Sequence, residues 1–183
     1  TINMNYRIFV EKRPAFQVEA QSLKNELNEN LQLSLQSLRY INVYDLFGFT
    51  PELLEQCRYT VFGETVTDTV TEISPLTSNS DSGLTSSKYL AVEYIPGQFD
   101  QRASSALDCV HLIDPNAEVE IRSSRLLIFD DTISEADMAK IRHYYVNAVE
   151  SREKDLSQLV QNQTADIKPL AKLDGFINMP REE

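Results

Sequence analysis

Two stretches of sequence decide the fold: Val10-Glu11-Lys12-Arg13-Pro14-Ala15-Phe16, and Val92-Glu93-Tyr94-Ile95-Pro96-Gly97-Gln98-Phe99. The Val-Glu pair and the proline recur after 82 residues, the phenylalanine recurs after 83, and Asp45 recurs as Asp130 after 85. The offset between matching residues grows by only a few residues along the chain, which short insertions in the second copy would explain. The chain is therefore predicted to contain one structural unit twice.

The first unit is predicted in residues 1–73. Its elements are a strand over residues 6–11, a helix over 16–30, a strand over 39–45, a helix over 50–59 and a strand over 65–71. β-Branched and aromatic residues mark the first strand, which Pro14 ends, and the last strand alternates between apolar and polar residues. Thr50 and Pro51 suit the N-cap and first position of the second helix. The inward face of the first helix is predicted as Val18, Leu23, Leu27 and Leu31.

The second unit is predicted in residues 89–154, after a linker over 74–88 whose turn-forming residues bury little surface. It repeats the order with a strand over 89–94, a helix over 100–112, a strand over 125–129 and a helix capped by Ser134. The inward stripe of this last helix is predicted as Ile133, Met138, Ile141, Tyr145 and Val149, and its boundary with a strand near Val146 is left open. Residues 155–183 are predicted as a partly helical start of another region.

These units predict the fold class. A unit of about 70 residues has too little sheet to fold alone, so the two should pair through their sheets or helices. We expect an α+β domain of two pseudo-symmetric β-α-β-α-β repeats, with antiparallel or mixed sheets covered by helices. Such a tandem repeat resembles a homodimer fused through its linker.

Composition excludes several classes of partner. The chain carries 28 acidic and 17 basic residues, a net charge of −11, and its cations are scattered, so nucleic acid is not an expected partner. No apolar run is long enough to suggest a membrane span. The first residues, Thr1 to Tyr6, lack the pattern of a signal peptide, and we expect a cytoplasmic protein.

Few residues suggest chemistry. Cys57 and Cys109 stand alone and are both predicted as buried small hydrophobic residues. Cys109 and His111, two apart on one predicted helix, point to different faces, which argues against a nucleophile pair.

Asp130-Asp131 could hold a metal or share a proton, but their place between a strand and a capped helix favours a turn role. Five glycines leave no phosphate-binding loop, so no catalytic, cofactor-binding or metal-binding residue is assigned.

The most unusual segment is residues 95–106, which joins a predicted strand to a predicted helix. Its Pro-Gly turn precedes a candidate docking loop of Gly97, Gln98, Phe99, Asp100, Gln101 and Arg102. Asp100 can cap the helix, and the glutamines and arginine place donors near its N-terminus, where an anion or the backbone of a partner could dock. The alternative is a plain turn.

Segment 95–106, together with residues 6–13, 43–47 and 149–153, resembles the phosphoribosylformylglycinamidine synthase family, and Leu173-Asp174-Gly175-Phe176 resembles the start of that family's linker region. The likeness covers nearly the whole chain and is greatest to the long, fused form. The N-terminal domain of that form is similar to two copies of the small dimeric subunit of the split form. The resemblance therefore implies a repeat, as found above.

The resemblance also implies an activity for the full-length enzyme: ATP- and Mg-dependent conversion of formylglycinamide ribonucleotide to the amidine in purine biosynthesis, with ammonia from glutamine. The family's histidine-containing active-site motif does not occur around His111 or His143, so no catalytic residue is carried over. This chain is expected to be a non-catalytic structural and docking domain, whose partners are the synthetase and glutaminase domains of the same polypeptide. Two alternatives remain: a free-standing regulatory module that binds a small metabolite between the repeats, and a small hydrolase that uses Asp130 and His143.

Overall fold

A computed structural model describes residues 3–76, 88–95, 97–148 and 151–153 of the chain. The predicted region 155–183 and most of the predicted linker lie outside the described residues. The strands are β1 (Met4–Lys12), β2 (Leu38–Phe49), β3 (Asp68–Thr71), β4 (Tyr89–Tyr94), β5 (Glu120–Phe129) and β6 (Ser151–Glu153). The helices are α1 (Val18–Leu31), α2 (Pro51–Arg58), α3 (Gln101–Ile113) and α4 (Glu135–Ala148), and a 3-10 turn spans Pro14–Phe16.

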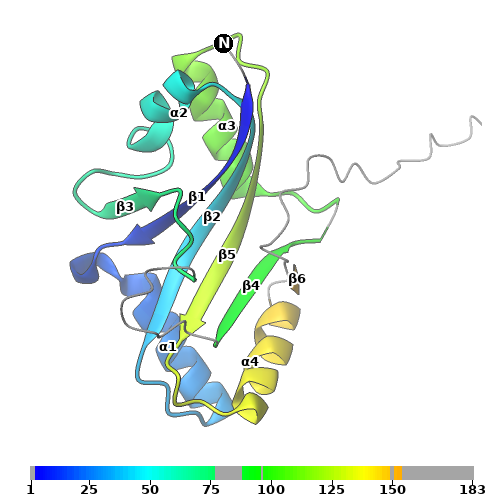
Figure 1. Ribbon diagram of the computed structural model, residues 1–183. Coiled ribbons are helices and arrows are strands. Elements are labelled where there is room, and N and C mark those ends of the chain that lie inside the picture. The colour runs from blue at the N-terminus through cyan, green and yellow to red at the C-terminus, as the bar shows by residue number, and fades with distance from the viewer. Residues whose placement is uncertain (1–2, 77–87, 96, 149–150, 154–183) are drawn as a thin grey trace, which may run out of the picture.

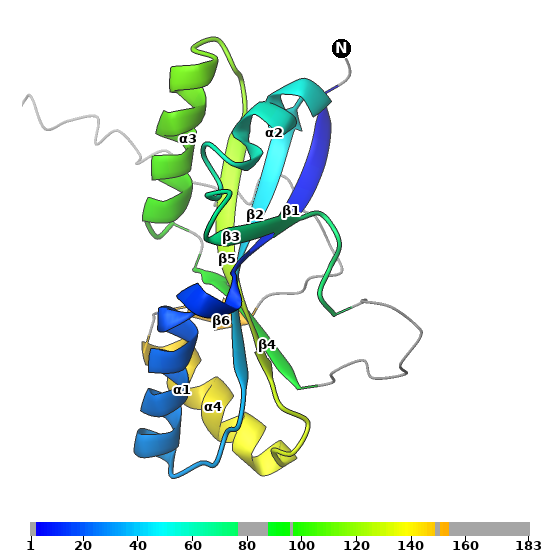
Figure 2. The same ribbon diagram turned by 90° about the vertical axis from the view of Figure 1, so that its left-hand side faces the viewer.

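The described elements form an α+β fold, which confirms the predicted class. One antiparallel sheet has the strand order β3-β1-β2-β5-β4-β6, so its two central strands are β2 and β5. The four described helices pack on one face of this sheet, as Figures 1 and 2 show. Helices α2 and α3 cover one end of that face, and α1 and α4 cover the other. Among them, none combines the length and apolar character that crossing a bilayer requires.

Each helix pair has its own core. Beneath α2 and α3 the largest fully buried side chains include Ile8, Leu46, Phe49 and Val110. Beneath α1 and α4 they include Leu27, Leu90, Leu127 and Ile141. A third, smaller core lies on the opposite face of the sheet and consists of Phe9, Ile41, Val43, Ala91, Leu126 and Ile128. Because burial of apolar surface is the main favourable term in folding, these three cores hold the sheet and helices together.

The predicted helix caps are confirmed. The Thr50 side chain accepts a hydrogen bond from the Leu53 N–H at 3.1 Å, and the Ser134 hydroxyl accepts one from the Asp137 N–H at 3.1 Å. Asp100 caps α3 through the Ala103 N–H at 3.0 Å. Each cap satisfies a backbone donor that the first turn of a helix leaves without a partner.

Three other details differ from the sequence-based expectation. Val18 is 72% exposed rather than inward, because it opens α1 and Ala20 takes the buried place. Residues 65–67 are not a strand, because the pairing of β3 with β1 ends where Lys12 lies opposite Asp68. Beyond Lys12, Pro14 has no N–H to continue the hydrogen bonds between the two strands. Strand β5 begins at residue 120 rather than 125, because β2 offers a partner along its length.

We predict that Asp100 is the most costly cap to remove. Its carboxylate also accepts hydrogen bonds from the N–H and hydroxyl of Ser123, both at 2.7 Å, and so ties α3 to β5. Asp100→Ala should lower the free energy of unfolding by about 2–3 kcal/mol, against about 1 kcal/mol for Thr50→Ala, as measured by urea denaturation. The control is Asp108→Ala, an exposed acid of the same helix, which should stay within about 0.5 kcal/mol of the unmodified chain. Equal effects of Asp100→Ala and Asp108→Ala would contradict this account.

Candidate functional site

A polar belt crosses the helix-covered face of the sheet between the two helix pairs. We define it by Lys12, Tyr40, Asn42, Tyr44, Tyr94, Arg102 and Arg125, which line the hollows described below. The strand registers place Val10, Asn42, Arg125 and Val92 in one row across β1, β2, β5 and β4. The outer members of this row are valines and the two central ones are polar, so the polar side chains gather where the halves of the sheet meet.

Two hollows lie in this belt. The larger has a volume of about 460 Å³ and is lined by Tyr44, Val61, Tyr94, Gln101, Arg102, Ser105, Ala106, Cys109 and Arg125. The smaller, of about 190 Å³, is lined by Val10, Lys12, Gln17, Glu19, Ala20, Tyr40, Asn42, Asp68 and Arg102. A narrow crevice beside Arg125, of about 10 Å³, is too small for a ligand. Arg102 lines all three, so its side chain stands at their junction.

Tyrosine hydroxyls are the hydrogen-bond partners of the two belt arginines. Arg102 Nη1 lies 3.5 Å from Tyr44 Oη. Arg125 donates to the hydroxyls of Tyr145 at 3.3 Å and Tyr94 at 3.4 Å, and its guanidinium lies over the Tyr94 ring, 5.9 Å from the ring centroid. Within the described part of the chain, neither guanidinium has a carboxylate within 4.0 Å. Among the described residues, these guanidiniums therefore have hydroxyl partners and no paired carboxylate, while Glu93 and Glu19 line the neighbouring hollows with Arg102.

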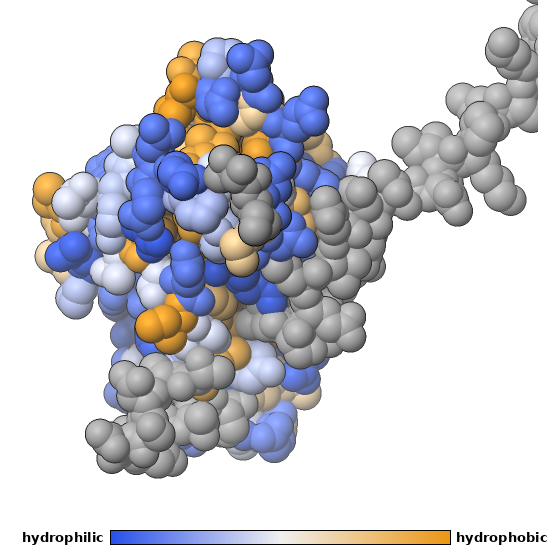
Figure 3. All heavy atoms as spheres, turned by 45° about the horizontal axis from the view of Figure 1, so that its top comes forward, coloured by the Kyte–Doolittle hydropathy of each residue, from blue (hydrophilic) through white to orange (hydrophobic). Residues whose placement is uncertain are grey.

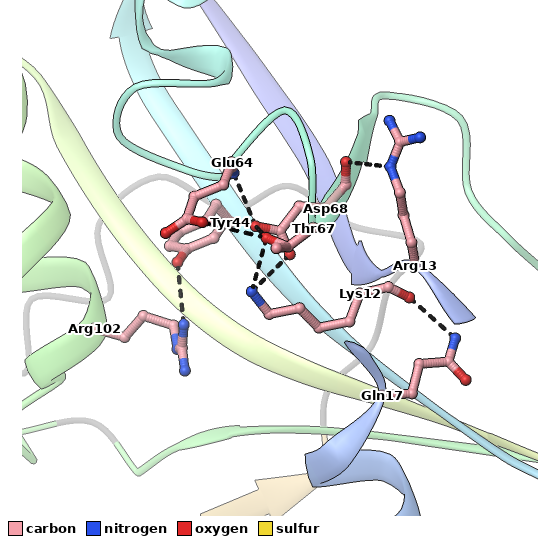
Figure 4. Close-up of polar contacts among 8 residues, drawn as sticks. All are labelled: Lys12, Arg13, Gln17, Tyr44, Glu64, Thr67, Asp68 and Arg102. Carbon is pink, nitrogen blue, oxygen red and sulfur yellow. Dashed lines mark hydrogen bonds and ion pairs between the residues drawn. The ribbon is translucent and has the colours of Figure 1, made fainter. Parts of the chain in front are cut away.

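The opposite end of the belt is neutralised internally. Lys12 Nζ lies 2.9 Å from Asp68 Oδ1, and Asp68 Oδ2 accepts a hydrogen bond from the Glu64 N–H at 2.8 Å. Figure 4 shows this pair and the Arg102–Tyr44 contact in one view. Burial raises the pKa of the Tyr40 hydroxyl above its ordinary value, so Tyr40 stays neutral in the physiological range. The net positive charge of the belt therefore lies at its Arg102 and Arg125 end.

The structure places the predicted docking loop beside this belt. Gly97 has a φ of +91°, which glycine adopts without strain, and the Gln98 N–H closes the turn on the Ile95 carbonyl at 3.0 Å. Phe99 is 75% exposed. Gln101 and Arg102 line the larger hollow, while Asp100 is occupied as a cap. The loop thus has one apolar contact residue and two polar residues that turn toward the belt.

The other candidates have structural partners. His111 Nε2 lies 3.1 Å from the Ala117 carbonyl oxygen, and Asp130 Oδ2 accepts a hydrogen bond from the Gln36 N–H at 2.7 Å, which ties the end of β5 to the loop before β2. Cys57 is buried as predicted, and burial raises the pKa of its thiol to about 11. The prediction that Cys109 is buried is wrong: it is exposed and lines the larger hollow. Over the described ranges, no three His, Cys, Asp or Glu side chains lie close enough to hold a metal ion.

Sequence reasoning identified Gln101 and Arg102 but missed the tyrosines and the second arginine of the site. Tyr44 and Arg125 belong to strands that are adjacent only through the β2–β5 register, and Tyr94 joins them from β4. A usable signal existed on the face that should be apolar: Asn42 interrupts one predicted strand, and Arg125 begins another.

Comparison with known proteins gives no relative: no family model, curated protein or solved structure matches the chain.

Cysteine accessibility gives a direct check of this geometry. Iodoacetamide should add one group to the native chain, at Cys109, because Cys57 is buried and its raised pKa keeps it a thiol. In urea both cysteines should react. Mass spectrometry of the intact chain and its peptides measures this, and Cys109→Ser should abolish the native adduct. Rapid labelling of both residues in the native state would contradict the packing of α2.

Proposed function

We propose that this chain is the N-terminal structural and docking domain of a long-form phosphoribosylformylglycinamidine synthase. In this proposal it is non-catalytic, and its partners are the synthetase and glutaminase domains of the same polypeptide. Those domains carry out the ATP- and glutamine-dependent formation of the amidine in the cytoplasm, with ATP and Mg bound outside this chain. The proposal starts from the family resemblance of the sequence, and the doubled unit within the fold supports it.

The order of the elements is the observation that carries the proposal. The chain runs through strand, helix, strand, helix and strand twice, as β1-α1-β2-α2-β3 and as β4-α3-β5-α4-β6. In the sheet, the first three strands lie in the order β3-β1-β2, and the equivalent strands of the second run follow in the reverse order, β5-β4-β6. Two copies related by a two-fold axis between β2 and β5 would have this arrangement, as expected of a fused dimer of one small subunit.

Buried positions follow the same offsets as the sequence repeat. The inward residues of α1, Ala20, Leu23 and Leu27, correspond after 83 residues to Ala103, Ala106 and Val110 of α3, which are also inward. On the opposite face of the sheet, Ile41 and Val43 correspond after 85 residues to Leu126 and Ile128. Matching cores at matching offsets support two copies of one packed unit rather than two unrelated halves.

The roles of the candidate catalytic side chains support a non-catalytic domain. The contact of His111 with the Ala117 carbonyl and the bond from Gln36 to Asp130 hold loops in place. Cys109 is exposed, but the nearest histidine in the sequence, His111, is engaged with that carbonyl. A nucleophile needs a base within hydrogen-bond reach, and these contacts provide structural support instead.

The docking loop supplies the contact surface in this proposal. Phe99 exposes 75% of its surface at the turn before α3, although burial of an aromatic ring is favourable. Figure 3 shows mainly hydrophilic side chains on the visible face, with smaller hydrophobic areas among them. An exposed aromatic residue is a common anchor of protein interfaces.

Reconstitution tests the proposal. The chain should bind a long-form enzyme that lacks its own N-terminal domain, and the mixture should form the amidine with ATP and glutamine. The chain alone should be inactive. Complex formation is measured by size-exclusion chromatography and turnover by product analysis. Amidine formation by the chain alone, or failure to form the complex, would overturn the proposal.

The docking loop can be tested in the same assay. Phe99→Ala should weaken the complex by about tenfold or more, as expected when an interface anchor is lost. Leu112→Ala is the matched control, because Leu112 is 84% exposed at the other end of α3 and should change the affinity little. Equal affinities of the two variants would place the contact elsewhere and remove the loop from the proposal.

The second candidate, a regulatory module, is favoured by one observation: the larger hollow holds two arginines that have no paired carboxylate among the described residues, beside the boundary between the two halves. Tight binding of a small metabolite there, without affinity for the synthetase and glutaminase domains, would favour this candidate over the docking domain.

A further inference from the structure

The charge of the larger hollow is opposite to that of the chain. The chain carries a net charge of −11, yet two arginines and no acid are found among the described residues that line this hollow. Local potential, rather than net charge, decides which ligand a concave site attracts, because low-dielectric walls focus the field of nearby charges. The hollow is therefore a local anion-attracting site on an acidic protein.

Within the described part of the chain, protein acceptors engage only a minority of the N–H donors of these arginines. A guanidinium has five N–H donors, and the bonds described above engage one atom of Arg102 and two of Arg125. Their acceptors are tyrosine hydroxyls at 3.3–3.5 Å, longer than the about 2.7–3.2 Å that is usual for N–H···O hydrogen bonds. Arg125 is half-buried, and a partly buried cation with weak partners costs free energy that an incoming anion would offset, whereas Arg102 is exposed and free to turn toward a ligand.

The repeat shows that packing does not require these arginines. At the offsets of the matched cores, Arg102 corresponds to Glu19, Arg125 to Tyr40 and Tyr94 to Lys12. Equivalent core positions are apolar in both halves of the chain, whereas equivalent belt positions differ in charge. Because the first half folds with other residues at the equivalent places, the arginine pair is a property of one half and not of the scaffold.

From this geometry we infer that the larger hollow binds a small phosphate monoester. A phosphate dianion matches two guanidiniums in charge and has oxygens to accept hydrogen bonds from both, whereas a carboxylate would neutralise one. The hydroxyls of Tyr44 and Ser105 line the same hollow, and its Tyr94 ring can pack against the ester group. A volume of about 460 Å³ falls in the range of about 300–1,000 Å³ typical of small-molecule sites.

Phenyl phosphate is a suitable probe because it combines a phosphate dianion with one ring. Isothermal titration of the full chain should show saturable binding at one site, with a Kd of about 1 mM or tighter. Inorganic phosphate should bind more weakly because it lacks the ring, and benzoate more weakly because it has a single charge. Absence of saturable binding, or a benzoate affinity equal to that of phenyl phosphate, would overturn the inference.

Variants locate the site. Arg102→Gln and Arg125→Gln should each weaken phenyl phosphate binding by about tenfold or more, since each removes a charged donor. Arg122→Gln is the matched control: it removes the same charge from β5, but Arg122 lies on the other face of the sheet, paired with Glu120 and over the Phe47 ring. It should change the affinity by no more than about twofold.

Two further results would decide the inference. If Arg125→Gln does not fold, Arg125→Lys keeps the charge but loses the planar fork, and it should bind with intermediate affinity. Binding that is unchanged in the Arg102 and Arg125 variants, or equally weakened in Arg122→Gln, would overturn the site. The inference does not rest on the proposed docking role, which is tested by complex formation without any phosphate ester, so the failure of one leaves the other standing.

Discussion

The antiparallel pairing of β2 with β5 is the constraint on which the rest of the structure depends. It runs from Leu38 opposite Phe129 to Phe47 opposite Glu120 and joins the two halves into one sheet. Successive side chains of a strand point to opposite faces, so a slip of one residue would exchange the faces of β5. Arg125 would then leave the belt and Leu126 would enter it. The opposite-face core and the polar belt therefore have the same origin.

The helices explain why the middle of the sheet is polar. Each helix packs with one from the other half, α1 with α4 and α2 with α3, and the pairs cover opposite ends of one face. The strip of sheet between them keeps access to solvent, and there polar side chains replace apolar ones. A site on this strip is held by regular strands and by the first turn of α3, whose start Asp100 fixes to Ser123. Sites on such rigid elements position ligands more accurately than sites on loops.

Local signals in the sequence predicted the order of elements but not the site. Pro14 and the caps at Thr50, Asp100 and Ser134 act on neighbouring residues, so they could be recognised without tertiary information. The first residues of β5 are mostly polar and become strand because β2 pairs with them, so their sequence alone does not mark a strand. The belt depends on the register between β2 and β5, which lie about 80 residues apart in the sequence. Cys109 is exposed, contrary to the prediction, because the side of α3 that carries it faces the larger hollow.

The register of β2 and β5 is tested most directly by nuclear Overhauser contacts between backbone protons of the full chain. The account predicts cross-strand contacts between Asn42 and Arg125 and between Ile41 and Leu126, with slowly exchanging amides along both strands. Contacts shifted by one residue, or rapid exchange along β2 as in an exposed edge strand, would contradict it.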